Sequence, residues 1–213
     1  MTTTELAKHL QHTNVRPDAT RNDIIAHIST AAECSFHAVM LQPCWVPLAK
    51  DMLRGTAVRV ASAIAYPLGG ETTAMKVHLA RELVRINVDK VRFQANVGFL
   101  RSDMDTEFAT EIRAIVEAAD GRPVKSMSEF GLLSEEQQIR CIRIAEAGVA
   151  FVKNSSGVGP GGSPATPRVI RFMRTHLRAE QRSRPRAVSR RGSRPSICWR
   201  QARSCWGPVL RRQ

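Results

Sequence analysis

The sequence predicts a parallel α/β fold, and its pattern matches a TIM-type (β/α)8 barrel best. Short apolar runs alternate with helical segments along the chain, at a spacing of about 20–30 residues from strand to strand. No G-x-G-x-x-G motif follows the first predicted strand, so the pattern does not favour a dinucleotide-binding sheet. Only six βα units are recognisable, two fewer than a closed barrel requires.

The first half of the chain contains three of these units. Strands are predicted over residues 10–15, 37–42 and 58–65, and helices over residues 21–35 and 46–53. Thr20 or Asn22 can cap the first of these helices, because both side chains accept hydrogen bonds from free backbone N–H groups. Proline and glycine in the segment 66–70 end the third strand.

The second half repeats the alternation. Helices are predicted over residues 72–86, 104–119 and 134–147 and from residue 167, with strands over 90–97, 123–129 and 149–153. In the helix 72–86, Met75, Leu79, Leu83 and Ile86 keep helical spacing.

Lys153 ends the sixth predicted strand and precedes small hydroxyl residues and a glycine-rich loop, residues 154–162. In a parallel barrel the carboxyl ends of the strands carry the chemistry. A lysine there is either a Schiff-base nucleophile or a phosphate contact. The structural alternative, a solvated lysine at a strand end, stays open on this pattern alone.

Composition limits the class of protein. The 213 residues suffice for one substantial core, assigned here to residues 1–180, and no run of 18 apolar residues predicts a membrane span. The N-terminus lacks the features of a signal peptide, and the five cysteines show no zinc-site spacing. A cytoplasmic protein with reduced thiols is the expectation.

Six segments, in order, resemble the deoxyribose-phosphate aldolase family, which consists of class I aldolases built on a (β/α)8 barrel. The matching segments are HTNVRPDAT (12–20), QPCWVPLA (42–49), YPLGG (66–70), NVG (96–98), PVK (123–125) and FVKNSSG (151–157). Together they cover about residues 8–178. The resemblance implies reversible cleavage of 2-deoxy-D-ribose 5-phosphate to D-glyceraldehyde 3-phosphate and acetaldehyde, without a metal or another cofactor.

The resemblance places the Schiff-base lysine at Lys153 and substrate or phosphate contacts at Asn154, Ser155, Ser156 and Gly157. Such a lysine must be unprotonated near neutral pH, although its ordinary pKa is about 10.4. Lowering this pKa by about three units requires a bias of about 4 kcal/mol against the charged form. Burial and a second ammonium supply this bias. In the family that ammonium is a lysine on the seventh strand. A small phosphorylated sugar or aldehyde is the implied partner, and a homodimer is a possible assembly.

Two positions depart from the family pattern. Arg92 occupies the place of the fourth-strand aspartate of the proton relay, and an arginine cannot act as the base at working pH. Gln11 replaces the aspartate before His12. The site therefore favours another aldehyde or phosphate ester, or is disabled. Lys125 keeps its family position, where it either contributes positive potential or forms a structural ion pair with Glu129 or another carboxylate.

The C-terminal segment, residues 181–213, does not fit the barrel. It carries ten arginines and no lysine or acidic residue, whereas residues 1–180 carry 22 basic and 19 acidic residues. This segment can be interpreted as a basic arm that binds nucleic acid or as an unstructured tail. No sequence motif of a nucleic-acid-binding domain is recognisable, so the sequence does not favour nucleic acid as the partner. We favour a frameshift near residue 181.

The genetic code permits that interpretation. In the shifted frame, each new codon takes the third base of one residue's codon and the first two bases of the next. Codons that are consistent with residues 183–189 can then encode Lys-Ala-Ser-Gly-Gly-Ile. The same shift over residues 197–209 permits a helix end followed by Gly-Thr-Ser. These match the family's seventh-strand lysine and eighth-strand phosphate loop. The chain as written is then predicted to fold poorly and to be nearly inactive, since it lacks the ammonium beside Lys153.

Overall fold

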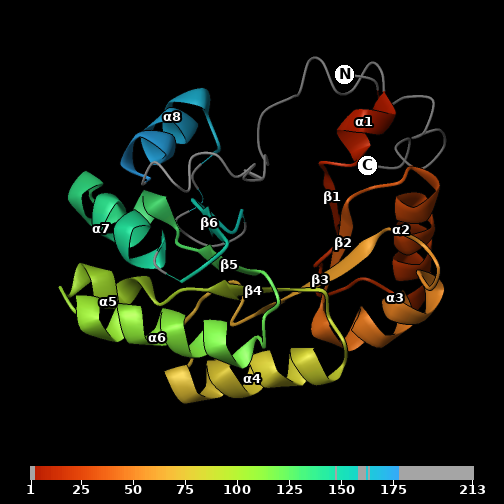
Figure 1. The fold of residues 1–213 in the computed structure, drawn as a ribbon, viewed down its shortest axis with the longest axis horizontal. Helices are drawn as coiled ribbons and strands as arrows, with labels where there is room; N and C mark the ends of the chain where they lie inside the picture. Colours follow the sequence, from red (N-terminus) through yellow and green to blue (C-terminus); the bar gives the residue numbers. More distant parts are fainter. Residues whose placement is uncertain (1–2, 147, 158–161, 163, 178–213) are drawn as a thin grey trace.

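The computed structural model describes residues 3–146, 148–157, 162 and 164–177. Within them, six parallel strands form one curled sheet in the order β1-β2-β3-β4-β5-β6, with β1 and β6 at its edges. Figure 1 shows the sheet curving into an open half-barrel with helices on its outer side. This arrangement confirms the predicted α/β barrel architecture with six βα units.

The strands are short and follow one another in space as they do in the chain. They are β1 (Gln11–Thr13), β2 (Ala38–Leu41), β3 (Arg59–Ile64), β4 (Lys90–Gln94), β5 (Val124–Met127) and β6 (Phe151–Lys153). Each pairs in parallel with the next, which places successive crossover helices on one side of the sheet.

The helices connect these strands. They are α1 (Thr3–Ala7), α2 (Arg21–Glu33), α3 (Val46–Met52), α4 (Thr73–Arg85), α5 (Val97–Arg101), α6 (Asp105–Ala118), α7 (Glu135–Glu146) and α8 (Pro167–His176). Short 3-10 turns lie at Pro43–Trp45 and Phe130–Leu132.

Side-chain caps explain several of the boundaries. Thr20 accepts a hydrogen bond from Asp23 N while Asp23 bonds back to Thr20 N, so Thr20 rather than Asn22 caps α2. Asn96 caps α5 by accepting from Gly98 N. Because this cap starts a helix, β4 ends at Gln94, and the predicted strand over 90–97 was three residues too long.

The two faces of the sheet differ. The outer face packs on the helices in the main apolar core, which includes Val39, Val60, Val91 and Val124. The inner face carries a small cluster of Met40, Ala61, Ala63 and Met127. Since side chains alternate along a strand, residues at even spacing from this cluster face the inside of the half-barrel.

The buried face of α4 includes only part of the apolar set that has helical spacing. Leu83 is buried, but Met75 and Leu79 are exposed, and Lys76 and Ala80 occupy the buried positions instead. Lys76 tolerates complete burial because Nζ donates to Glu111 Oε2 at 2.7 Å and to the carbonyls of Gly69 and Gln94. A matched carboxylate on α6 therefore sets the rotation of α4.

Residues 181–213, to which we assigned an arginine-rich tail read in a shifted frame, lie outside the described residues. None of the described helices combines the length and apolar character that a bilayer-spanning helix needs.

Candidate active site

Lys153 is the last residue of β6 and faces the inside of the half-barrel. It pairs in register with Met127, a member of the inner apolar cluster, and paired residues of parallel strands share a face. The side chain is half-buried, and Nζ donates to Ser156 O at 3.3 Å. The predicted nucleophile thus lies at the carboxyl edge of the sheet, where barrel chemistry is expected.

The residues after Lys153 form a buried turn rather than an open loop. Asn154, Ser155 and Ser156 are each at most 4% exposed, while Gly157 is exposed with φ of 85°. The backbone pairing of β5 and β6 continues into the turn, since Ser128 N donates to Lys153 O and Phe130 N to Asn154 O. The turn is consequently fixed against the end of β5.

Glu129 supplies a second anchor for this turn. It accepts a hydrogen bond from the backbone N–H of Ser156 and one from Ser155 Oγ at 3.3 Å. Glu129 is 2% exposed and has φ of 37°, in the left-handed region that non-glycine residues rarely adopt. This conformation ends β5 at Met127, two residues before the predicted end, and turns the carboxylate towards β6.

Sequence reasoning assigned Glu129 only one role, as one of the carboxylates that could pair with Lys125. In the described part of the chain the Glu129 carboxylate bonds to Ser155 and Ser156, and no ion pair joins it to Lys125. The signal that could have found its role was the carboxylate directly after a barrel strand, next to the segment that follows Lys153.

Arg92 and Lys125 lie side by side on the inner face, because they are register partners on β4 and β5. Arg92 is 7% exposed, and Lys125 is 6% exposed. Burial lowers the pKa of Arg92 to about 10. Burial, followed by repulsion from Arg92, Lys153 and Lys90, lowers the pKa of Lys125 well below its ordinary value. The Lys125 ammonium also lies 5.0 Å from the ring centre of Phe151.

Further cations continue this cluster towards the amino-terminal ends of the strands. Lys90 begins β4, Arg59 begins β3, and both share the inner face with Arg92 and Ala61. Burial and repulsion from Arg59 and Arg92 lower the pKa of Lys90 to about 8. Lys90 Nζ also contacts His37 Nε2. We call Arg59, Lys90, Arg92 and Lys125 the inner cation cluster.

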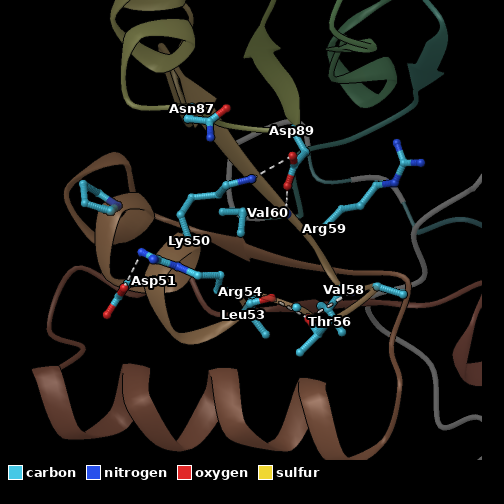
Figure 2. Close-up of a pocket in the computed structure, with 13 residues that line it drawn as sticks. Lys50, Asp51, Leu53, Arg54, Thr56, Val58, Arg59, Val60, Asn87 and Asp89 are labelled. Atoms are coloured by element: carbon cyan, nitrogen blue, oxygen red, sulfur yellow. Dashed lines mark hydrogen bonds and ion pairs between the residues drawn. The ribbon is translucent and has the colours of Figure 1, made fainter.

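A hollow of about 570 Å³ lies elsewhere, between α3 and the amino-terminal ends of β3 and β4 (Figure 2). Its cations have acidic partners: Lys50 pairs with Asp89 at 2.9 Å and Arg54 with Asp51 at 2.9 Å. Arg59 borders the hollow but extends away from the Lys50–Asp89 pair (Figure 2). The hollow is therefore separate from the carboxyl edge and from Lys153.

The first strand contributes a different environment. Gln11, at the position of the family's aspartate, is partly buried, and its side-chain nitrogen makes no hydrogen bond. The neighbouring His12 stacks on His27, with ring centres 3.7 Å apart. Burial lowers the pKa of His12 to about 3 and that of His27 to about 4, and His27 adds repulsion to His12. Both rings are thus neutral at pH 7.

Comparison with known proteins agrees with this geometry. No family model matches the chain. The chain is 36% identical over 172 residues to the deoxyribose-phosphate aldolase of Dictyoglomus turgidum, covering 80% of this chain and 78% of the relative. It is 37% identical over 171 residues to that of Clostridium botulinum, covering 80% of each.

The fold agrees with solved structures of the same kind. A deoxyribose-phosphate aldolase candidate from Coccidioides immitis superposes with a TM-score of 0.78 at 26% identity, over 82% of this chain and 68% of that one. The tetrameric deoxyribose phosphate aldolase of Aeropyrum pernix also gives 0.78, at 20% identity, over 90% of this chain and 79% of that one, which supports the fold alone. On the identity and coverage of these relatives, the chain belongs to the deoxyribose-phosphate aldolase family.

Proposed function

We propose that this chain is a class I aldolase that forms an imine between Lys153 and an aldehyde, and that it cleaves 2-deoxy-D-ribose 5-phosphate slowly. The observation that carries the proposal is the placement of Lys153 at the carboxyl end of β6, on the inner face and close enough to Lys125 for mutual repulsion. The relatives' names supply the substrate and the reaction type.

Lys125 is the group that favours an unprotonated amine here. An ammonium is destabilised by a neighbouring ammonium, and the repulsion acts on both partners. The role that the family gives to a seventh-strand lysine therefore falls in part to Lys125 on β5. The turn anchored by Glu129 holds Asn154, Ser155 and Ser156 beside the amine, where their polar groups contact the substrate.

Arg92 limits the proposed turnover. Imine formation and carbon–carbon cleavage both require proton transfers, which a positioned carboxylate accelerates by roughly 10²–10⁴-fold. Arg92 remains cationic at neutral pH, since burial lowers its pKa only to about 10. We therefore expect the imine to form while the later proton transfers are slow.

Borohydride reduction in the presence of acetaldehyde tests the first step. A stable ethyl adduct should appear at Lys153 by mass spectrometry and should be absent in Lys153→Ala. In Lys125→Met the adduct should form more slowly at pH 7, because the repulsion that favours the unprotonated form of the Lys153 amine is lost. An adduct found only at another lysine would contradict the proposal.

Replacing Arg92 by Asp tests the second step. Cleavage of 2-deoxyribose 5-phosphate by Arg92→Asp should exceed that of the unmodified chain by at least about tenfold, because a proton-accepting group returns to the site. If a folded Arg92→Asp variant cleaves 2-deoxyribose 5-phosphate no faster than the unmodified chain, Arg92 does not limit the cleavage rate. The finer expectations, a cytoplasmic enzyme and a homodimer as its assembly, are part of the same proposal and are testable by fractionation and by sedimentation.

A further inference from the structure

The inner cation cluster has positive charge that the described residues do not balance. The groups that act on Lys125 are all cationic, and burial alone accounts for the lowered pKa of Arg92. Asp89, the acidic residue next to Lys90, offsets part of the repulsion on Lys90, but its two oxygens bond to Lys50 and to the backbone N–H of Val60. Arg92 and Lys125 are the two buried members, and buried cations without a counter-charge are costly in an apolar interior.

Arg92 carries a hydrogen-bond donor that has no acceptor. Its Nε is buried and makes no hydrogen bond in the structure, although the residue is 7% exposed. Buried donors are nearly always satisfied, so an unpaired guanidinium nitrogen indicates a group that the described residues do not supply. The donor fork of arginine matches the oxygens of a phosphate or carboxylate.

The neighbours of Arg92 favour a small ligand. Ala63 is its register partner on β3, and Ala61 is the partner of Lys90, so short side chains flank the cations on that side. Lys90 is partly exposed and Arg59 exposed, so the cluster reaches solvent from the amino-terminal ends of β3 and β4. Charge, donors and neighbours together point to an ion of phosphate size.

We propose that the inner cation cluster binds a divalent oxyanion of the phosphate class, with Arg92 as its central donor and Lys90 and Lys125 as its flanking cations. The site goes beyond the proposed aldolase function. It lies on β4 and β5 below the carboxyl edge that carries Lys153, and it does not use the turn of residues 154–157. Bound phosphate neutralises the cluster and stabilises the folded half-barrel.

Thermal unfolding and equilibrium dialysis of the full chain with inorganic phosphate test the site. At pH 7 and constant ionic strength set with sodium chloride, phosphate should raise the unfolding midpoint in a saturable way, since a ligand of the native state stabilises it. Arg92→Met should bind phosphate at least about tenfold more weakly, and Lys125→Met should also weaken it. The matched control is Arg101→Met, an exposed arginine of α5, which should behave like the unmodified chain.

Three results distinguish the sources of an effect. Lys153→Ala should retain phosphate binding, which separates anion binding at Arg92 from imine formation at Lys153. Equal, non-saturating shifts in all variants would show only the general action of phosphate on protein stability, and would overturn the proposal. Loss of binding in Lys153→Ala but not in Arg92→Met would place the anion at the substrate centre and equally overturn it. Dialysis measures the bound phosphate directly, so it distinguishes these results even for a variant without a clear thermal transition.

Discussion

Two regions of the sheet bury charged side chains, and they do so in opposite ways. Between α4 and α6, Lys76 and Glu111 are both fully buried and form a 2.7 Å ion pair. The remaining hydrogen-bonding groups are also used: Lys76 Nζ bonds two carbonyls, and Glu111 Oε1 accepts from Asn96 N at 3.0 Å. On the inner face of β4 and β5, Arg92 and Lys125 are nearly as buried but face other cations.

This difference indicates that the Lys76–Glu111 pair has a structural role, whereas the inner cation cluster is a candidate for a functional role. The Lys76–Glu111 pair ties the segment after β3, through Gly69, to the end of β4 and to the start of α5, through Asn96. It needs no ligand, because every charge has a partner. In the described part of the chain the inner cation cluster forms no ion pair, and its one side-chain hydrogen bond joins Lys90 to His37, so its charge is explained by what it binds or by its effect on Lys153.

Breaking the structural pair should give the largest effect on stability. Glu111→Gln leaves the Lys76 ammonium buried without its counter-charge and should lower the free energy of unfolding by about 3–5 kcal/mol. Urea unfolding monitored by circular dichroism measures this loss. The control is Glu82→Gln, which breaks the exposed pair with Arg85 and should leave the midpoint unchanged. A loss in Glu111→Gln no greater than in Glu82→Gln would remove the distinction between the two regions.

The sequence predicted the order and type of the main elements because strand and helix periodicity, glycine and proline turns, and caps such as Thr20 are local signals. Lys153 was found because a lysine at the end of an apolar strand is also a local pattern. Strand ends were less accurate, since β4 and β5 stop where Asn96 and Glu129 take special roles that only their partners reveal.

The partners themselves were not predictable from periodicity. Lys76 belongs on a polar face by residue type, and its burial depends on Glu111, 35 residues away. The link from Glu129 to Ser155 and Ser156 spans 26 and 27 residues. Such pairs exist only once two crossovers have placed neighbouring strands side by side, so hydrophobic spacing could not indicate them.

Removing a charge from the inner cation cluster should do the opposite of breaking the pair. Lys125→Met replaces a buried, repelled ammonium by an apolar side chain of similar length and should raise the free energy of unfolding by about 1–3 kcal/mol at pH 7. Because folding depresses the pKa of Lys125, the native lysine costs stability most at pH values well below about 10.4 and least above it.

The advantage of Lys125→Met over the unmodified chain should therefore shrink as the pH rises from 7 to 10. Denaturant unfolding at both pH values measures it, with Lys8→Met, an exposed lysine, as the control that gains nothing. A destabilised Lys125→Met variant would mean that the ammonium has a partner that offsets its burial, and the contrast with Lys76 would disappear.

The smallest effect expected at pH 7 concerns His12 and His27, which bury ionisable groups in a third way, by remaining neutral. Their pKa values of about 3 and about 4 lie below the ordinary 6.5, so the folded state binds fewer protons than the unfolded chain. Their contribution to stability is complete above about pH 6.5 and is lost as the pH falls towards 4, by about 1 kcal/mol per pH unit for each ring.

Replacing His27 by Phe keeps an aromatic ring against His12 and removes one titrating group. The decline of the unfolding midpoint between pH 7 and pH 5 should become about half as steep in His27→Phe, and it should be unchanged in His78→Gln, which alters an exposed histidine of α4. An identical decline in all three chains would assign the acid sensitivity to carboxylates instead. The stacked rings of His12 and His27 would then contribute to stability through packing alone, and their neutral state would not affect its pH dependence.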